Sequence, residues 1–311
     1  MKLKNTLTFG SNFGYQSHLK SIIKLKKAES NFIYSPNAHK KNNLNKKFLL
    51  NRKQIKNRKF DLISIATPPL IQNQICKSNI KNSKHFFLEK PLTENYIKTR
   101  KLFKLLKKNK INYYFNFIFT KIKTFQIFKS IIKKKKIIKG VYTWKFRQGY
   151  FINHRVNWKI INSKGGGLVN FYLIHVFYNL LFLIGEFKIQ KVIFKKEKIL
   201  RKLSVQLKTK KGFNIIINMD IDSSSSTHKI LFWDKKNKYE IKNNSKNWVK
   251  YFRIIKNNNV LKIKENNFDR DHLTFLNLKS LIARRKNKKE LKFFELAHYY
   301  CNETNKKINI K

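Results

Sequence analysis

The stretch Phe86-Phe87-Leu88-Glu89-Lys90-Pro91-Leu92 decides how the first third of this chain folds. Three apolar residues end abruptly in a carboxylate, an ammonium group and a proline, and a short apolar run of this kind predicts a buried strand. In α/β folds, ligands bind where such strands end. The sequence therefore predicts that Glu89 and Lys90 lie at a ligand-binding edge of a sheet.

The segment from Asp61 to Pro69 has the same design, because its apolar strand stops at Thr67-Pro68-Pro69. A helical stretch lies between the two strands and is expected to place its apolar residues on one common face: Leu70, Ile71, Ile75 and Ile80. Strand, helix and strand predict a β-α-β unit whose polar strand ends lie on the same side.

A glycine turn begins the chain's first β-α step. Residues 7–9 predict a strand, residues 10–18 a turn with Gly10 and Gly14, and residues 19–25 a helix, which is the arrangement that binds a dinucleotide pyrophosphate. The G-x-G-x-x-G fingerprint is incomplete, since Asn12 stands at its third position and Tyr15 at its sixth. Asn12 tolerates positive φ and could preserve the turn.

The second predicted strand, residues 31–34, ends at Ser35 and offers no acidic residue, although an acidic residue at this point selects NAD in Rossmann folds. Ser35 and Asn37 could bind a ribose hydroxyl. The basic residues that follow could instead approach a 2′-phosphate: His39, Lys40 and Lys41. The sequence therefore leaves NAD and NADP open as the cofactor.

The three segments 10–18, 61–69 and 83–92 together resemble the Gfo/Idh/MocA family, which is named after glucose-fructose oxidoreductase and inositol dehydrogenase. Members share a glycine loop closed by histidine, a D-x-x-x-I-A-T-P-P strand and a G-K-H-V-x-x-E-K-P-L strand. The resemblance implies an α/β protein with an N-terminal Rossmann-type doubly wound parallel sheet. It also implies a C-terminal α+β domain with a mainly antiparallel open sheet that forms homo-oligomers.

A strand predicted over residues 111–119 places the boundary between residues 1–118 and 119–311. In the second part, alternating apolar residues on both sides of Lys210-Lys211-Gly212 predict a hairpin. Residues 213–221 and 228–233 are expected to be neighbouring strands joined by a loop at 223–226. Helices are predicted over 122–132, 168–184, 273–282 and 291–300.

The family's G-G-G-x-L-x-D-x-G-x-H segment is matched at Gly165-Gly166-Gly167 and at His175, but Phe171 and Leu173 replace its aspartate and later glycine. The missing carboxylate indicates another catalytic arrangement, another substrate or lost activity.

Hydride transfer from a carbinol carbon requires a group that removes the hydroxyl proton. Lys90 is the first candidate, because a partly buried lysine beside a cationic ring loses its proton more easily. His175 is the second. A surface lysine paired with Glu89 and a histidine packed in the core are the competing interpretations. The catalytic candidates are therefore Lys90 and His175.

The resemblance implies further site residues. Cofactor contacts are expected from Gly10, Asn12, Phe13, Gly14, Ser35, Thr67, Pro68, Glu89 and Lys90. Substrate contacts are expected from Trp158, Lys159, Asn170, Tyr172 and His175. The implied substrate is a small sugar, cyclitol or sugar derivative, and no metal site is predicted.

The formal net charge is +55, from 71 lysine and arginine residues against 16 aspartate and glutamate residues. Such a charge favours polyanions as partners. The lysines are spread along the whole chain, however, without a nucleic-acid-binding signature, and joint enrichment with asparagine, isoleucine and phenylalanine indicates a base-composition bias. We therefore expect no dedicated nucleic-acid partner and keep a polyanion-binding protein as the weakest alternative.

Cys76 and Cys301 are far apart in the sequence and predict two reduced thiols in a cytoplasmic protein. The longest apolar stretch, residues 168–184, falls short of the roughly 20 residues that span a bilayer. We expect no membrane partner. The leading hypothesis is an NAD(P)-dependent oxidoreductase, and the main alternative is a family member that binds cofactor or sugar without turnover.

Overall fold

A computed structural model describes residues 3–25, 28–35, 49–149, 157–195, 197, 199–263, 268–283 and 288–309. The chain divides into two units, each made of two stretches: unit 1 is 1–118 with 270–291, and unit 2 is 119–269 with 292–311. The predicted second domain, 119–311, included 270–291. That stretch packs with unit 1 instead, because the apolar pattern of a helix does not specify which core will bury it.

Unit 1 is built on a parallel sheet of five strands in the order β2-β1-β3-β4-β5. Its strands are β1 (Leu3–Phe9), β2 (Ala28–Tyr34), β3 (Leu62–Ile65), β4 (His85–Leu88) and β5 (Asn112–Phe115). Every residue of β3 is buried, as in parallel strands covered on both faces. The Rossmann-type doubly wound sheet is therefore confirmed.

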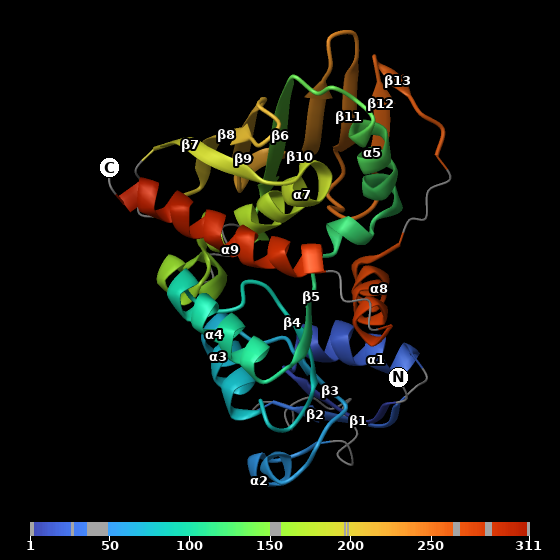
Figure 1. The fold of residues 1–311 in the computed structure, drawn as a ribbon, viewed down its shortest axis with the longest axis vertical. Helices are drawn as coiled ribbons and strands as arrows, with labels where there is room; N and C mark the ends of the chain where they lie inside the picture. The colour runs from blue at the N-terminus through green and yellow to red at the C-terminus, as the bar shows by residue number, and fades with distance from the viewer. Residues whose placement is uncertain are drawn as a thin grey trace. The chain divides into compact units, whose positions relative to one another are not determined.

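Helices cover both faces of this sheet (Figure 1). On one side lie α1 (Lys20–Lys24), which continues the π-helical turn η1 (Gly14–Leu19), and α8 (Arg270–Ile282); on the other lie α3 (Pro69–Ser78) and α4 (Tyr96–Lys108). The short α2 (Arg52–Lys56) precedes β3.

Helix α3 turns a different face to the sheet from the one its apolar spacing suggests. Leu70 and Ile71 are 46% and 45% exposed, whereas Gln72 and Cys76 are fully buried. The predicted common apolar face is thus only partly buried. Gln72 can be buried because hydrogen bonds satisfy its amide, as described below.

The end of the last strand of this sheet differs from the prediction. Strand β5 ends at Phe115, and Phe119–Lys121 instead form a 3-10 turn, η4, in unit 2. The N-cap of α4 is Asn95, whose side chain accepts the Lys98 backbone N–H at 3.0 Å.

Unit 2 contains a sheet of eight strands in the order β13-β12-β11-β10-β6-β9-β8-β7, in which all pairs are antiparallel except β6 with β9. The strands are β6 (Lys139–Arg147), β7 (Phe187–Phe194), β8 (Lys202–Thr209), β9 (Asn214–Asp220), β10 (Asp222–Trp233), β11 (Lys238–Asn243), β12 (Arg253–Lys256) and β13 (Asn259–Val260). The mainly antiparallel open sheet is therefore confirmed.

Strands β8 and β9 form the predicted hairpin, with Leu207 opposite Ile215 and Gly212 at φ +91° in its turn. The expected pairing of β9 with β10 is wrong, because β6 lies between them. Residues 223–226 are not a loop but an irregular part of β10, where the register against β6 shifts. Polar serines fit such an unpaired bulge, which explains why the run resembled a loop.

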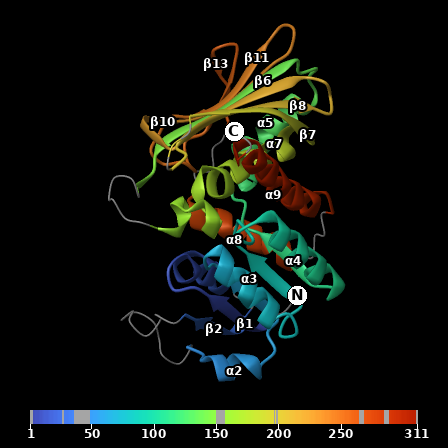
Figure 2. The same ribbon diagram turned by 90° about the vertical axis from the view of Figure 1, so that its left-hand side faces the viewer.

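The helices of unit 2 lie against one face of this sheet (Figure 2). They are α5 (Lys123–Lys133), α7 (Ile174–Ile184), which continues the π-helical turn η7 (Leu168–Leu173), and α9 (Lys288–Asn309). Helix α9 packs on α7 through stacked rings of Tyr178 and Phe294, 5.1 Å apart. Two short 3-10 turns precede η7: η5 (Trp158–Ile160) and η6 (Asn162–Lys164).

No helix in the described ranges is both long and apolar enough to cross a membrane.

Candidate functional site

The predicted cofactor residues of unit 1 gather at one edge of the parallel sheet. Gly10 follows β1, Thr67 follows β3 and Glu89 follows β4, and these three strands are parallel neighbours. The chain runs from β1 outward to β2 and then returns to β3 on the other side of β1. Ligands of doubly wound sheets bind at such a reversal, outside the carboxyl ends of the strands.

The glycine turn has no room for side chains. Gly10 has φ +115°, and a Cβ on it would lie 2.5 Å from the Ala66 carbonyl oxygen. A Cβ on Gly14 would lie 2.8 Å from the Phe9 carbonyl oxygen. Both glycines therefore let the start of η1 approach β1 and β3 closely.

Asn12 does not take the conformation proposed for it. It is exposed, and it is absent from the described non-glycine residues with positive φ: Lys110, Tyr251, Asn257 and Asn258. The left-handed residue of this turn is Gly10. Asn12 instead accepts a backbone hydrogen bond from Gln16 at 2.8 Å, the first step into η1.

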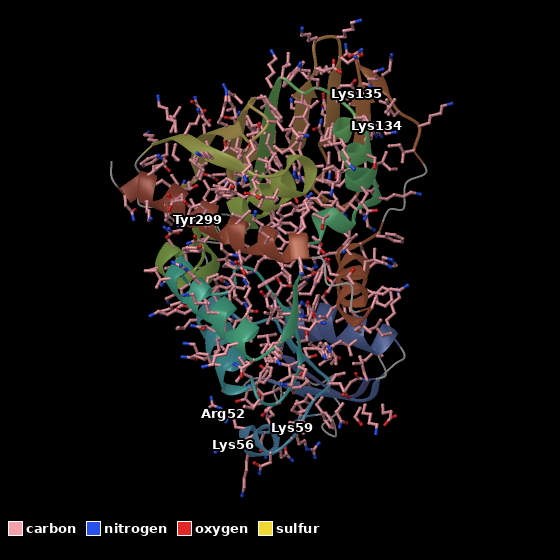
Figure 3. All side chains as sticks on the ribbon, in the orientation of Figure 1. Arg52, Lys56, Lys59, Lys134, Lys135 and Tyr299 are labelled. Atoms are coloured by element: carbon pink, nitrogen blue, oxygen red, sulfur yellow. The ribbon has the colours of Figure 1, made fainter. Side chains whose placement is uncertain are left out.

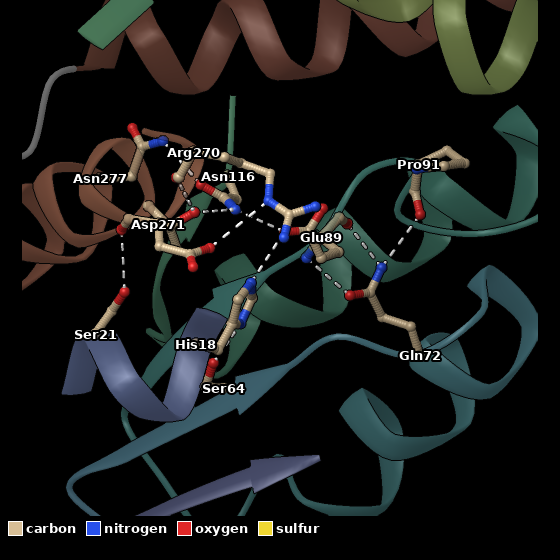
Figure 4. Close-up of polar contacts among 11 residues, drawn as sticks. His18, Ser21, Ser64, Gln72, Glu89, Pro91, Asn116, Arg270, Asp271 and Asn277 are labelled. Atoms are coloured by element: carbon tan, nitrogen blue, oxygen red, sulfur yellow. Dashed lines mark hydrogen bonds and ion pairs between the residues drawn. The ribbon is translucent and has the colours of Figure 1, made fainter. Parts of the chain in front are cut away.

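The Glu89 carboxylate is the centre of a largely buried polar network (Figure 4). Its Oε1 accepts from His18 Nε2 at 3.0 Å and from Asn116 Nδ2 at 2.7 Å. His18 is fully buried, and its Nδ1 lies 2.7 Å from Ser64 Oγ. Because an ionised carboxylate only accepts, Nε2 carries a proton, and in the neutral ring Nδ1 accepts from the Ser64 hydroxyl.

Helix α8 completes this network from the far end of the chain. Asn277 Nδ2 donates to Asn116 Oδ1 at 2.9 Å, and Asn116 Nδ2 also donates to Thr274 Oγ1 at 3.1 Å. The Arg270 guanidinium lies 4.5 Å from the ring centre of Phe13, which precedes η1. These contacts explain why 270–291 belongs to unit 1.

Lys90 is half-buried and follows β4 in a segment without regular secondary structure. Its peptide bond to Pro91 is cis. Since the Glu89 carboxylate bonds His18 and Asn116, it is not merely the counter-ion of a surface lysine.

The remaining cofactor candidates fit a ligand at this edge. Thr67 Oγ1 is buried and finds no hydrogen-bond partner among the described residues, so this hydroxyl can serve a bound molecule. Pro68 is the N-cap residue of α3, and Ser35 directly follows β2. The glycine turn and this hydroxyl suit a dinucleotide. Asn37, His39, Lys40 and Lys41 lie outside the described residues.

His175 belongs to unit 2 and lies near the start of α7. It is 6% exposed, and its ring meets the edge of Phe119 at 5.5 Å and that of Trp144 at 6.1 Å. Rings thus surround the histidine for which the family pattern predicted a nearby carboxylate.

Phe171 packs among other candidate substrate residues. Its ring lies 5.4 Å from Trp158 and 4.9 Å from Tyr172, and Lys159 Nζ lies 5.5 Å from its centre. A Cβ on Gly166 would lie 2.1 Å from the Trp158 carbonyl oxygen. The glycine at position 166 therefore allows the chain just before η7 to pack directly against η5, the turn that contains Trp158.

Asn170 makes structural hydrogen bonds. Its Nδ2 donates to Asn162 Oδ1 at 3.0 Å, and its Oδ1 accepts from Asn305 Nδ2 at 2.9 Å. These bonds join η6, η7 and α9 within unit 2. Both ends of the amide are thus already engaged by the protein.

Sequence reasoning missed several residues around Glu89. The missed residues are Ser64, Gln72, Asn116, Thr274 and Asn277. Except for Gln72, which stands in the polar run Gln72-Asn73-Gln74, they are single polar residues inside apolar runs, such as Ser64 within Leu62-Ile63-Ser64-Ile65. Buried polar side chains require partners, so each of them pointed to a network.

Basic side chains are spread over the surface drawn in Figure 3, from Arg52, Lys56 and Lys59 in unit 1 to Lys134 and Lys135 in unit 2. A dedicated polyanion-binding protein would gather them on one face. This distribution argues against that alternative.

Comparison with known proteins supports the arrangement at the sheet edge. Residues 4–117 match the family described as an oxidoreductase family with an NAD-binding Rossmann fold. An uncharacterized oxidoreductase of Synechocystis is 25% identical over 187 residues, which cover 57% of this chain and 50% of that protein. The match thus spans half the length of this curated relative.

Two solved structures share the fold of nearly the whole chain. The 3-ketoreductase KijD10 of Actinomadura kijaniata, in complex with NADP and TDP-benzene, has a TM-score of 0.76 at 12% identity and covers 94% of each chain. The aldose-aldose oxidoreductase of Caulobacter crescentus, complexed with glycerol, has a TM-score of 0.77 at 12% identity and covers 98% of each chain. The glycine turn, the Thr-Pro-Pro end and the Glu-Lys-Pro end thus all lie within residues 4–117, the stretch that matches the Gfo/Idh/MocA family of oxidoreductases.

Proposed function

We propose that this protein transfers hydride between NAD or NADP and a secondary hydroxyl or ketone of a sugar, cyclitol or sugar derivative. The observation that carries the proposal is the fixed Glu89-Lys90-Pro91 segment at the carboxyl edge of β4. A lysine held at this edge can act on an oxygen beside a bound nicotinamide, which supplies or accepts the hydride.

Lys90 is the proposed proton-transfer residue. In the oxidative direction, its Nζ would take the proton that leaves the substrate hydroxyl; in the reductive direction, it would return that proton to the carbonyl oxygen. His175 is the second proposed acid/base. Its ring packing against Phe119 and Trp144 would hold its orientation.

The cofactor would be held by unit 1. The proposed contacts are the glycine turn with Gly10, Asn12, Phe13 and Gly14, then Ser35, Thr67, Pro68 and Glu89. The N–H groups at the start of η1 suit a pyrophosphate. Both NAD and NADP stay open, because Ser35 carries no charge that would favour one of them.

The substrate would be bound by residues of unit 2. Trp158, Lys159, Asn170, Tyr172 and His175 are the proposed contacts, and Lys159 with Trp158 is supported best, because both meet the half-buried Phe171 ring. Asn170 has the weakest support, since its amide already bonds Asn162 and Asn305. The sugar class is supported by the aldose-aldose oxidoreductase with the same fold.

Calorimetric titration with NAD(H) and NADP(H) tests the proposal. Binding of at least one of the two pairs is expected, followed by hydride exchange with a member of a panel of polyols and sugars. Absence of binding for both pairs at millimolar concentration would refute it.

A second candidate is a family member that binds cofactor or sugar without turnover. Phe171 and the fully buried Leu173 favour it, because they fill the positions of the family's aspartate and glycine. Cofactor binding without exchange on any polyol would support this candidate. Exchange that disappears in Lys90→Ala would exclude it.

The face of the eight-stranded sheet that α5, α7 and α9 leave uncovered is the proposed surface for a homo-oligomer (Figure 2). Ile216 is 39% exposed, and its burial alternates with that of its inward-facing neighbours in β9. Sedimentation analysis is expected to show an oligomer that Ile216→Glu dissociates. A monomeric wild-type protein would contradict this assignment.

A further inference from the structure

The Gln72 side chain holds the backbone on both sides of Lys90. Its Oε1 accepts the Glu89 backbone N–H at 2.9 Å. Its Nε2 donates to the carbonyl oxygens of Glu89 at 2.8 Å, Pro91 at 3.2 Å and Leu92 at 3.2 Å. Gln72 is fully buried on α3, so these bonds form away from water (Figure 4).

This segment depends on such bonds because β4 ends at Leu88 and α4 starts only at Tyr96. The Glu89 N–H also donates to the Ile65 carbonyl oxygen of β3 at 3.2 Å, but the carbonyl groups of Glu89, Pro91 and Leu92 lie beyond the end of the strand, and buried backbone groups need a partner. One amide side chain can supply an acceptor and two donors at once. Gln72 thus supplies, on both sides of Lys90, backbone hydrogen bonds that a strand or a helix would otherwise supply.

The Glu89 side chain is fixed separately. Its carboxylate bonds the side chains of His18 and Asn116, whereas Gln72 bonds backbone groups of the segment. Gln72 therefore constrains the peptide planes that flank Lys90, while the carboxylate network constrains the side chain of the residue before it. Only the hydrogen bonds of Gln72 therefore fix directly the backbone position from which the Lys90 side chain extends.

We propose that Gln72 is a positioning residue for Lys90: by bonding the backbone at Glu89, Pro91 and Leu92, it aims the lysine at the reacting oxygen. The inference rests on the proposed function of Lys90. Misplacing a catalytic group by about 1 Å can reduce the rate about 100-fold. Gln72 touches no reacting atom, so its loss should act through Lys90 alone.

The test compares Gln72→Met, which keeps the length of the side chain but loses its hydrogen bonds, with Gln74→Met, an exposed position of the same helix. At saturating cofactor, Gln72→Met is expected to lower kcat about 100-fold, with cofactor Kd changed by less than about threefold. Gln74→Met should match the wild type. A folded Gln72→Met protein with wild-type kcat overturns the proposal.

A double-mutant cycle separates positioning from a general loss of structure. In a Lys90→Met background, Gln72→Met should cause no further loss of the residual kcat, because the residue being aimed is gone. Equal losses in both backgrounds would contradict positioning. If Gln72→Met does not fold, Gln72→Glu replaces it, since that variant keeps the acceptor but loses the donors; wild-type kcat in Gln72→Glu also overturns the proposal.

Hydrogen exchange gives a readout that needs no activity, so the proposed function can fail independently. In full-length Gln72→Met, the Glu89 amide keeps its 3.2 Å bond to the Ile65 carbonyl oxygen but loses the 2.9 Å bond to Gln72, so it should exchange up to about fivefold faster, because one net hydrogen bond is worth about 1 kcal/mol. Unchanged protection of this amide would overturn the proposal, whether or not the wild type turns over. Faster exchange together with no nicotinamide binding would instead refute the proposed function and, with it, the catalytic role of the lysine that Gln72 aims.

Discussion

The Glu89-Lys90-Pro91 segment of unit 1 and the His175 segment of unit 2 are both matched to family motifs, yet the protein surrounds them differently. Around Glu89, polar side chains from η1, β3, α3, α8 and the chain after β5 form hydrogen bonds. Around His175, aromatic rings predominate: Phe119 and Trp144 meet it directly.

The difference shows two ways of fixing a candidate catalytic residue. Hydrogen bonds fix distance and angle and are costly to break when they are buried. Ring packing fixes orientation but supplies no charge. Unit 1 therefore has the clearer signature of a reaction site. In unit 2, the histidine of the motif that the segment resembles is present as His175, but Phe171 stands at the position of its carboxylate.

The largest effect is expected for Lys90→Met, since general acid-base residues contribute about 10²-fold to 10⁴-fold to the rate. Loss of hydride exchange on that scale, measured at saturating cofactor, would assign the chemistry to unit 1. Lys84→Met is the matched control, because Lys84 is exposed at the opposite end of β4. Exchange rates within about threefold of the wild type would mean that Lys90 is not the proton-transfer residue.

Gly10→Ala should be the next most severe change. The new methyl group would meet the Ala66 carbonyl oxygen at 2.5 Å, at φ +115°. We expect a loss of more than about 3 kcal/mol in the free energy of unfolding of unit 1, and loss of nicotinamide binding.

Gly212→Ala provides the comparison, because Gly212 has φ +91° and a methyl group added to it would have no described neighbour within 4 Å. Strain without a clash should cost only about 1 kcal/mol. Thermal unfolding of the two variants measures both effects. Equal destabilisation would show that the close packing of the glycine turn contributes little.

The aromatic interior of unit 2 should make its stability depend on pH. Burial lowers the pKa of His228 from 6.5 to about 3, beneath the stacked Trp144 ring. Between these values the unfolded chain binds a proton that the folded unit does not. Stability is therefore complete above pH 6.5 and falls on acidification by up to about 1.4 kcal/mol per pH unit until about pH 3.

His298 adds to the same slope, since burial lowers its pKa from 6.5 to about 4. In urea unfolding between pH 7 and about pH 4.5, His228→Gln is expected to show a shallower loss of stability than the wild type, with the slope of His298 remaining. Parallel curves for variant and wild type would show that His228 is not kept neutral by the fold.

The smallest effects are expected at Phe171. Phe171→Asp and Phe171→Asn both remove the ring contacts with Trp158 and Tyr172, which should cost about 1 to 2 kcal/mol of stability. If His175 works without the carboxylate, kcat should stay within about threefold in both variants. An increase of about tenfold in Phe171→Asp alone would instead show that the missing carboxylate limits turnover.

The elements of this protein could be predicted because their signals are local. Apolar runs at 62–65 and 85–88, the glycine turn after β1 and the alternation around Gly212 each specify a strand or turn within a few residues. The candidate residues Gly10, Thr67, Glu89 and Lys90 could also be identified from the sequence, because each follows a predicted strand and parallel strands end at a common edge.

Other features depend on contacts between distant parts of the chain. Asn277 bonds Asn116 across 161 residues, and no periodicity in either segment encodes that pairing. Strand β6 separates β9 from β10, although β9 and β10 are adjacent in sequence. Gln72 could not be told apart from the polar residues Asn73 and Gln74 that follow it, because its burial follows from the backbone carbonyls it meets and not from its own polarity.

The sequence alone therefore determined the fold class, the family resemblance and the strand-end residues, because spacing and residue type act over short range. The tertiary structure decided how Glu89-Lys90-Pro91 is held and which unit buries α8. It also decided that rings surround His175. Buried hydrogen bonds and ring contacts are made between elements far apart in the chain, so only the packed structure selects which of the possible partners meet.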